Sequence, residues 1–238
     1  MLKSFVKQWL RELGYVVARY DAARDPAAVR RGLFDKVGVN VVYDVGANIG
    51  QYADVLRGNG YRGRIVSFEP LRQAYRALQI RAKDDRDWIA VHAAIGAAVG
   101  KSTINISGNS YSSSLLPATP RLTQSSPASA FVQTESIEVL RFDDVFREYN
   151  RVGDHPYLKI DTQGYTAKVL SGAANSLEHI VGVEVEMSLV PLYEGEPLIG
   201  EIITVLYAQG FNLVLIKPEF TDMTSGQQLQ VDGIFVRC

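Results

Sequence analysis

A short apolar strand that ends in a glycine turn is the feature that most constrains this fold. Residues 41–45 read Val-Val-Tyr-Asp-Val, the turn follows as Gly-Ala-Asn-Ile-Gly, and residues 51–56 continue with helical spacing. This pattern predicts a strand, a tight turn and a helix. Gly46 permits a backbone turn that a Cβ would block, and Gly50 lets the helix begin close to whatever lies over the turn. The sequence therefore predicts a β-α unit with a binding site at the carboxyl end of its strand.

The turn and the next strand offer complementary groups to a ligand. N–H groups at the helix start can donate to a carboxylate, and Asp44 at the strand end suits an ammonium group. A second short strand, residues 64–68, leads to Glu69, nineteen residues after Gly50. An acid at that place in a β-α-β unit accepts hydrogen bonds from ribose hydroxyls. Together the two parts favour S-adenosylmethionine, which has an amino-acid end and a ribose.

A dinucleotide is the alternative ligand for such a turn. A pyrophosphate needs the pattern Gly-x-Gly-x-x-Gly, which this turn lacks. A dinucleotide-dependent oxidoreductase would also need a catalytic Tyr-Lys pair or an equivalent, and we cannot place one. A third interpretation is a non-catalytic cofactor-binding subunit that docks a partner through its basic N-terminal helices.

Six ordered blocks of the sequence resemble the FkbM-type S-adenosylmethionine-dependent O-methyltransferases. The resemblance covers residues 38–237 and rests on Asp44–Gly50, Phe68–Pro70, Ala94–Gly96, Ser112–Leu115, Leu158–Tyr165 and Val169–Ala173. It implies an α/β fold of the class I methyltransferases, which is a doubly wound, Rossmann-like and mostly parallel sheet of seven strands. It also implies methyl transfer to a hydroxyl of a sugar or of a glycosylated or polyketide-type small molecule.

The resemblance assigns the cofactor to the turn, the second strand end and the third block. The expected cofactor-binding residues are Asp44, Gly46, Ala47, Asn48, Gly50, Tyr52, Glu69, Pro70, Ala94, Ile95 and Asp161. In the family pattern an acid is common directly after the glycine of the third block. This sequence has Ala97 there, which leaves the contact to the adenine amino group unassigned.

Two acids on neighbouring strands are the candidate catalytic residues. Residues 156–161 predict a strand that ends in Asp161, and residues 180–187 predict the next strand, on which Glu184 and Glu186 share one face. A central strand is normally apolar on both faces, so these acids need partners or a ligand. Because a protonated hydroxyl is a poor nucleophile, we expect Asp161 to act as a general base, with Glu186 as the second candidate. Alternatively, Asp161 and Glu186 hold a Mg²⁺ ion.

A polar stretch in the middle of the chain predicts a loop over the acceptor. Residues 102–106 and 135–140 alternate as two extra strands, and residues 108–127 between them are rich in Ser, Thr, Asn and Pro. A structureless loop of this length is usually either a functional lid or disordered. The expected substrate-binding residues are Asn109, Tyr111, Ser112, Ser113 and Ser114, together with Gln163.

The sequence predicts an N-terminal helical extension, residues 1–38, ahead of one methyltransferase domain, residues 39–238. Apolar residues from Leu2 to Leu13 form one helical stripe, and Asp25-Pro26 marks a second helix start. Residues 1–39 hold eight Lys or Arg against four Asp or Glu. The extension either packs on the domain or approaches a membrane surface or a lipid-linked acceptor, because basic residues with Trp and Phe suit an interface.

Composition and charge exclude several classes of protein. The formal charge of −1, with acids and bases interspersed, argues against a nucleic-acid partner. Cys238 is the single cysteine, so an intrachain disulfide is excluded and a reducing compartment is indicated. No apolar run reaches the roughly 20 residues of a membrane span. We therefore expect a cytoplasmic enzyme that acts on a small-molecule or glycolipid hydroxyl.

Overall fold

A seven-stranded, mostly parallel sheet forms the centre of the protein in the computed structural model, which describes residues 2–15 and 21–237. Its strands are β1 (Val41–Val45), β2 (Arg64–Phe68), β3 (Trp88–Val91), β7 (Pro156–Ile160), β8 (Gly182–Ser188), β9 (Phe211–Thr221) and β10 (Gln228–Arg237). They lie in the order β3-β2-β1-β7-β8-β10-β9, and β10 is antiparallel to both of its neighbours. The predicted doubly wound α/β fold with an antiparallel last strand is confirmed.

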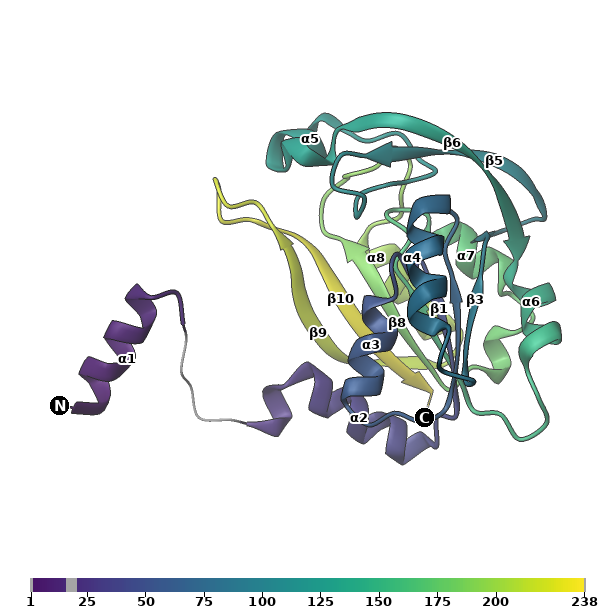
Figure 1. Cartoon of the computed structure of the whole chain (residues 1–238), viewed down its shortest axis with the longest axis horizontal. Helices are drawn as coiled ribbons and strands as arrows, with labels where there is room; N and C mark the ends of the chain where they lie inside the picture. The colour runs from purple at the N-terminus through teal and green to yellow at the C-terminus, as the bar shows by residue number, and fades with distance from the viewer. Residues whose placement is uncertain (1, 16–20, 238) are drawn as a thin grey trace.

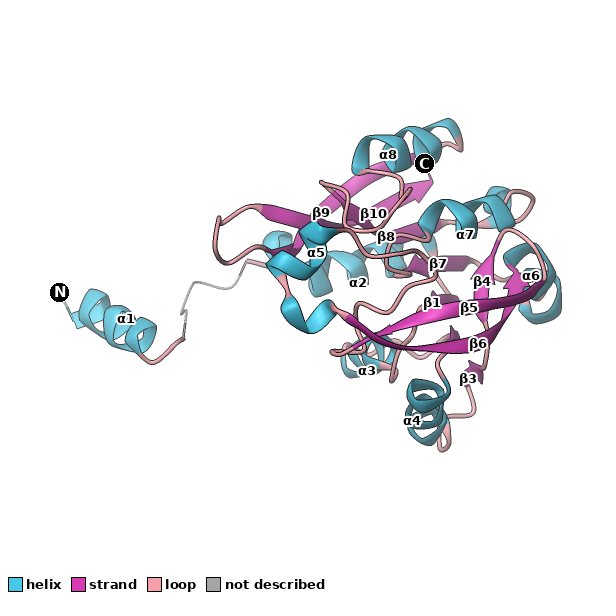
Figure 2. Ribbon diagram, turned by 90° about the horizontal axis from the view of Figure 1, so that it is seen from above, coloured by secondary structure: helices cyan, strands magenta, loops and turns pink. Residues whose placement is uncertain are grey.

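Helices cover both faces of this sheet (Figures 1 and 2). One face carries α2 (Pro26–Val37), α3 (Gln51–Gly58) and α4 (Arg72–Ala82), and the other carries α6 (Phe142–Tyr149), α7 (Thr166–Gly172) and α8 (Ile199–Ala208). On β1, Val42 packs in the first layer and Tyr43 in the second, because neighbouring strand residues point to opposite faces. Short 3₁₀ helices lie at Ala22–Arg24, Pro127–Ser129 and Leu177–His179.

A second, three-stranded sheet arches over the top of the main sheet in Figure 1. It consists of β4 (Ala94–Gly96), β5 (Gly100–Ser107) and β6 (Phe131–Arg141). The two extra strands predicted from alternation are the antiparallel pair β5 and β6. The chain leaves the main sheet after Val91 and pairs with β6 from Ala94 onward, so the block Ala94–Gly96 lies in this second sheet.

Residues 108–127, here called the polar segment, are more ordered than the sequence indicates. They contain helix α5 (Pro120–Ser125). Asn109 Oδ1 accepts hydrogen bonds from the Ser107 hydroxyl at 2.8 Å and from the Ser112 amide at 3.0 Å. The segment is therefore not structureless, because short polar side chains satisfy nearby main chain and one another. Its role as a lid over the acceptor stays a prediction.

The two N-terminal α-helices have different surroundings. Helix α1 (Leu2–Glu12) leaves Trp9 55% exposed, and Figure 1 shows it apart from the sheet. Helix α2 begins at the predicted cap, where the Asp25 side chain accepts an amide hydrogen bond. Its Phe34 packs edge-on against Tyr157 of β7, with ring centroids 4.6 Å apart. Of these two helices, α2 is the one that contributes to the described core.

Parts of the predicted N-terminal extension and the last residue of the chain lie outside the described residues. These are Met1, residues 16–20 and Cys238. Within the described residues, none of the helices has the length and apolar character that crossing a bilayer would require.

The position of Gly50 leads to a test of the packing around the first turn. Gly50 has φ +95°, and a Cβ there would lie 2.8 Å from the ring of Trp88. We expect Gly50→Ala to lower the free energy of unfolding by about 2 kcal/mol, through backbone strain and overpacking. Urea denaturation measures this change.

The matched control is Gly32→Ala, at an exposed position of α2 where a Cβ would meet nothing within 4 Å. This change should raise the free energy of unfolding by about 0.5 to 1 kcal/mol, because alanine is the better helix former. Equal effects of the two substitutions would contradict the packing that we describe.

Candidate functional site

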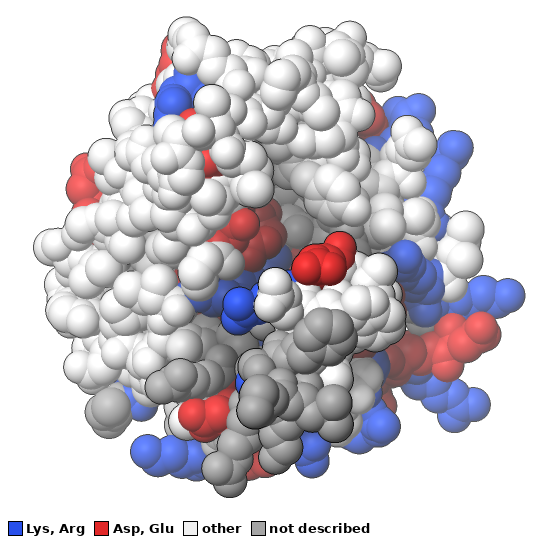
Figure 3. Space-filling model, turned by 90° about the vertical axis from the view of Figure 1, so that its left-hand side faces the viewer, with Lys and Arg blue, Asp and Glu red and all other residues white. Residues whose placement is uncertain are grey.

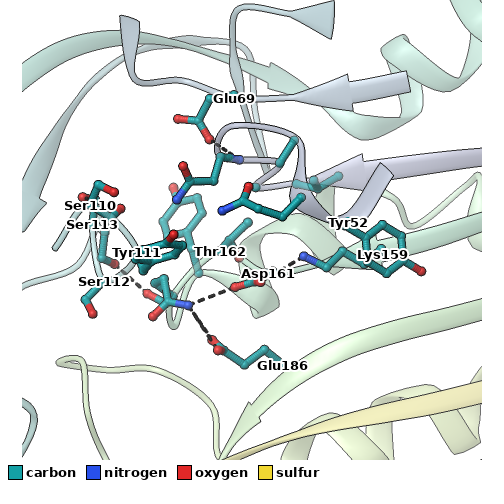
Figure 4. A pocket seen from close by; sticks show the side chains of 18 of the residues that line it. Tyr52, Glu69, Ser110, Tyr111, Ser112, Ser113, Lys159, Asp161, Thr162 and Glu186 are labelled. Atoms are coloured by element: carbon teal, nitrogen blue, oxygen red, sulfur yellow. Dashed lines mark hydrogen bonds and ion pairs between the residues drawn. The ribbon is translucent and has the colours of Figure 1, made fainter. Parts of the chain in front are cut away.

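A cavity of about 710 Å³ opens at the carboxyl ends of β1, β2, β7 and β8. Acidic and basic side chains gather inside the hollow in Figure 3, and Figure 4 shows the strand ends and the polar segment around one space. All of the expected site residues line this cavity except Asp44 and Gly50. The lining members are Gly46, Ala47, Asn48, Tyr52, Glu69, Pro70, Ala94, Ile95, Asn109, Tyr111, Ser112, Ser113, Ser114, Asp161, Gln163 and Glu186.

The first turn lies against the end of β7. Gly46 has φ +82°, and a Cβ at this position would lie 1.8 Å from the carbonyl oxygen of Asp161, so that only glycine fits. The amide groups of Gly46 and Ala47 donate to the Phe68 carbonyl. The amide of Asn48 donates to a carboxylate of the next strand end. These three turn amides are therefore used within the protein.

Two expected cofactor residues lie behind the cavity wall. The fully buried Asp44 accepts a hydrogen bond from Ser67 Oγ at 3.1 Å and lies 3.9 Å from Lys159 Nζ. Burial raises the pKa of Asp44 to about 6, although the Lys159 charge opposes that rise. Gly50 lies under the Trp88 ring. Asp44 and Gly50 therefore support the cavity wall without lining the cavity. The sequence could not show which turn residues line the cavity and which lie behind the lining.

Glu69 occupies the wall at the end of β2. Its carboxylate accepts amide hydrogen bonds from Asn48 at 2.8 Å and from Leu71 at 2.7 Å. Burial raises the pKa of Glu69 to about 7, while these two donors act in the opposite direction. The site thus contains an acid that titrates near neutral pH. Its apolar neighbours on the wall are Pro70, Leu71, Ala94 and Ile95.

The two candidate catalytic acids meet at a shared amide. Gln163 Nε2 donates to Asp161 Oδ1 at 2.9 Å and to Glu186 Oε2 at 2.9 Å. Figure 4 shows this link between Asp161 and Glu186. Lys159 Nζ donates to the second oxygen of Asp161 at 2.9 Å. The sequence placed Gln163 with the substrate-binding residues, and the structure places it between the acids.

These surroundings drive the pKa values of the two acids apart. Burial alone would raise the pKa of Asp161, but the charge and hydrogen bond of Lys159 outweigh burial and hold it below the usual value. Burial, followed by the charges of Asp161 and Asp232, raises the pKa of Glu186 well above the usual value. The pair therefore contains one fixed anion and one acid that retains its proton more tightly.

A buried ion pair that the sequence analysis missed closes another side of the cavity. Arg30 of α2 donates from Nε to Glu184 Oε2 at 2.7 Å and from Nη2 to Oε1 at 2.5 Å. The hydroxyls of Tyr52 and Tyr157 donate to the same carboxylate at 2.7 and 3.3 Å. The partner that Glu184 was expected to need is thus a residue 154 positions away in the sequence.

The hairpin formed by β9 and β10 adds charged residues to the cavity wall, and the sequence analysis assigned no role to them. Lys217 Nζ lies 2.9 Å from Asp232 Oδ2 and 2.8 Å from Glu219 Oε2. Asp232 pairs in register with Glu186 across β8 and β10, so the hairpin charges lie beside the candidate catalytic pair. The strands were predictable, but their register, which decides which face meets the site, was not.

The described residues contain no group of three or more His, Cys, Asp or Glu side chains that could hold a metal ion. The Mg²⁺ alternative therefore depends on Asp161 and Glu186 alone. A cation between these carboxylates would have to replace the Gln163 amide, which already donates to both.

The sequence comparison decides the family. The family profile described as "Methyltransferase FkbM domain" matches residues 44–213, a range that includes the glycine turn, Glu69, the polar segment and both acids. The chain belongs to the FkbM methyltransferase family. No curated protein sequence matches it. The resemblance noted in the sequence is therefore confirmed at the level of the family.

The comparison with solved structures finds methyltransferases at low sequence identity and with TM-scores below 0.5. The METTL16 methyltransferase domain is 9% identical, with a TM-score of 0.47 over 98% of this chain and 77% of that chain. Magnesium protoporphyrin IX methyltransferase from Synechocystis PCC 6803 is 9% identical, with a TM-score of 0.45 over 99% and 97%. Fibrillarin from Aeropyrum pernix is 16% identical, with a TM-score of 0.44 over 89% and 75%. The family assignment rests on the sequence match, not on these structures.

The buried ion pair yields a stability test. Arg30→Met should lower the free energy of unfolding by about 3 kcal/mol, because it leaves the Glu184 carboxylate buried without its cation. The double variant Arg30→Met/Glu184→Gln should recover a large part of that loss, since no charge is left unpaired. Urea denaturation compares the two variants.

The exposed neighbour Arg31 provides the matched control. Arg31→Met should change the free energy of unfolding by less than about 0.5 kcal/mol. A double variant as unstable as Arg30→Met alone would contradict the view that the unpaired charge dominates the loss.

Proposed function

We propose that this family member is an S-adenosylmethionine-dependent O-methyltransferase that acts on a hydroxyl of a sugar or of a glycosylated or polyketide-type small molecule. The observation that carries the proposal is the Asp161 and Glu186 pair, which lines the same cavity as Glu69 and the glycine turn. Methyl transfer to a hydroxyl needs the methyl donor and the acceptor side by side in one water-poor space. The glycine turn and Glu69 form one end of the cavity, which suits the cofactor. The acids Asp161 and Glu186 form the other end, which suits the acceptor.

The turn end of the cavity has groups that suit this cofactor. When bound, S-adenosylmethionine supplies a methyl group already activated by a positively charged sulfur. The oxygens of Glu69 have lone pairs left for ribose hydroxyls, since each accepts one amide. Asp44 is fully buried behind the cavity wall, with its Oδ1 3.9 Å from Lys159 Nζ, so it acts on the ammonium group through its charge and not by contact. The apolar wall formed by Pro70 and Ile95 suits the adenine ring.

The other end of the cavity supports a hydroxyl-rich, uncharged acceptor. Four carboxylates line this end, those of Asp161, Glu186, Glu219 and Asp232. Carboxylates accept hydrogen bonds from hydroxyl groups, and they repel the phosphates of a nucleic-acid backbone. Phe220 adds an apolar surface for a sugar ring. These features favour a sugar over a nucleic acid as the acceptor.

Within the pair, we assign proton removal to Glu186 and positioning to Asp161. A carboxylate whose pKa is held low by Lys159 is a weak base, although it remains a good acceptor of a hydrogen bond. Glu186 has a raised pKa, so its ionised form is the stronger base. This assignment reverses the order that we expected from the sequence.

A glycolipid acceptor is a specific variant of this proposal, and helix α1 favours it. Val6 and Trp9 are exposed on α1, which also carries Lys7 and Arg11, and Leu13 is exposed directly after the helix. Exposed apolar residues beside cations suit the interface of an anionic membrane. Sedimentation with anionic vesicles, compared between the wild type and Trp9→Ser, measures this contact.

Two assays separate the proposed enzyme from the other functions considered. Titration calorimetry with S-adenosylmethionine, S-adenosylhomocysteine and NAD⁺ distinguishes a methyltransferase from a dinucleotide-dependent oxidoreductase. Methyl transfer from labelled S-adenosylmethionine to a panel of glycosides distinguishes an enzyme from a non-catalytic cofactor-binding subunit. Binding of NAD⁺ alone would overturn the proposal.

Cofactor binding should follow the ionisation of Glu69. Its pKa of about 7 means that it is largely protonated at pH 6 and largely ionised at pH 8. Because ribose hydroxyls donate to the ionised form, affinity for S-adenosylhomocysteine should increase about tenfold over that interval. Titration calorimetry at several pH values measures the increase.

Glu69→Gln should remove most of this pH dependence and weaken binding at pH 8 by about 2 kcal/mol. The control is Glu178→Gln, an exposed acid outside the cavity, which should bind like the wild type. Wild-type affinity that does not vary between pH 6 and pH 8 would place the ribose elsewhere.

Turnover should depend on Glu186 rather than on an added metal ion. Glu186→Gln should lower kcat by at least about 100-fold, since a general base is removed, while affinity for S-adenosylhomocysteine stays the same. Wild-type kcat should rise with pH, because the pKa of Glu186 is raised and only its ionised form accepts a proton. EDTA should have no effect.

The exposed acid Glu194 supplies the control, and Glu194→Gln should keep full turnover. Loss of activity in EDTA with recovery in Mg²⁺ would instead support the metal mechanism. Full activity in the double variant Asp161→Asn/Glu186→Gln would exclude both mechanisms and leave positioning alone to explain catalysis.

A further inference from the structure

The backbone at Gln163 adopts a conformation that glutamine rarely takes. Gln163 has φ +50°, and the next residue, Gly164, has φ +86°. Among the described residues, the other non-glycine positions with positive φ are Asn48 and Ser110, and all three line the cavity. A side chain with a Cβ is unfavourable in this region, so the surrounding contacts must hold it there.

The amide of Gln163 is oriented by a tyrosine. The Tyr193 hydroxyl donates to Gln163 Oε1 at 2.8 Å, and Gln163 Nε2 donates to Asp161 and Glu186. An amide has its acceptor on one side and its two donors on the other. A hydroxyl donor at the oxygen therefore turns the nitrogen toward the carboxylates, with one N–H available for each.

Tyr193 is itself fixed from several directions. It is fully buried, and a Cβ at Gly164 would lie 2.9 Å from Tyr193 Cβ, so the turn after Gln163 lies directly on this residue. Glu196 Oε1 accepts the Tyr193 amide at 2.9 Å. The Tyr193 hydroxyl also lies 3.1 Å from the Ser112 carbonyl of the polar segment.

We propose that Gln163 and Tyr193 are positioning residues that hold the carboxyl groups of Asp161 and Glu186 together as one unit and connect that unit to the polar segment. Ser114 Oγ donates to the Gln163 carbonyl at 2.6 Å, so the segment touches the Gln163 main chain as well as its tyrosine partner. The proposal rests on the methyltransferase function proposed above. It moves Gln163 from binding the acceptor to arranging the acids.

The Gln163 amide, which bridges Asp161 and Glu186 and is here called the bridge, has charged groups near it on the neighbouring strands. These groups are Asp44 of β1, Lys159 of β7, Glu184 of β8, Lys217 and Glu219 of β9, and Asp232 of β10. The Gln163 N–H groups stabilise the ionised form of both acids and so lower the pKa of each. Without that donor, the pKa of Glu186 should rise further, and the acid limb of the kcat profile should move to higher pH.

Two substitutions test the bridge, and a third is the control. Gln163→Gly removes the amide and accepts the positive φ without strain, and Tyr193→Phe removes only the orienting hydroxyl. Tyr149→Phe, in α6 and outside the cavity lining, is the matched control. Carboxyl ¹³C titration of glutamate-labelled protein, with the Glu186 signal assigned through Glu186→Gln, reports ionisation without any need for turnover.

In Gln163→Gly, we expect the Glu186 titration to move to higher pH by about one pH unit. We expect kcat to fall at least about tenfold, with the KM for S-adenosylmethionine unchanged, because the acids are misplaced and the cofactor end is not. Tyr193→Phe should change both quantities in the same direction by less. Urea midpoints of Gln163→Gly and Tyr193→Phe close to that of the wild type show that the fold is intact. Tyr149→Phe should leave both the Glu186 titration and kcat unchanged.

An unchanged Glu186 titration in folded Gln163→Gly would overturn the proposal, since the amide would then have no effect on the acids. An unchanged titration in Tyr193→Phe alone would overturn the role of Tyr193. If the titrations move as expected but the wild type methylates no acceptor, the bridge stands and the proposed function fails.

Discussion

The contact between the first turn and the end of β7 is the constraint on which the site depends. β1 and β7 pair in register up to Val45 and Ile160, and the Asp161 amide donates to the Val45 carbonyl at 2.9 Å. The turn then passes so close to the Asp161 carbonyl that no side chain fits at Gly46. The glycine turn and Asp161 are therefore placed relative to each other by main chain alone. Side chains such as Gln163 only refine an arrangement that the backbone already imposes.

Two acids on β8 hold charge in different ways, and Glu184 is the more deeply buried of the two. Glu184 is neutralised by a guanidinium and two tyrosine hydroxyls, which satisfy both of its oxygens. Glu186 has a neutral amide as its hydrogen-bond partner and other acids nearby, so its proton is held more tightly. A fully paired charge supports the fold, whereas an incompletely paired one can exchange a proton during a reaction. Strand alternation puts both on the same face, two residues apart.

The parts of the molecule that the sequence predicted well are those set by local pattern. The strand before Gly46 and the acid at the end of β2 could be read from neighbouring residues, because strand period and turn chemistry act over a few positions. Asp161 and Glu186 could be expected to meet because parallel strands end at one edge of the sheet. The resemblance to a family added the order of the blocks and the hydroxyl acceptor.

What the sequence could not supply depends on distant residues. Tyr193 reaches Gln163 from thirty positions away, and no local pattern marks a tyrosine as the partner of an amide. Gly50 looked like a ligand contact, but its neighbour is Trp88, whose approach depends on how β3 pairs with β2. The polar segment looked structureless because its order comes from individual side-chain hydrogen bonds, which have no period in the sequence.

The pairing of Arg30 with Glu184 also bears on where this domain begins. The family match starts at Asp44, yet Arg30 lies ahead of it and supplies the cation for a carboxylate in the middle of the sheet. A fragment trimmed to the family boundary would uncover the ring of Tyr157, on which Phe34 packs, and would leave a bare anion in the interior. The ion pair between Arg30 and Glu184 thus makes helix α2 part of the folding unit, although α2 lies outside the family match.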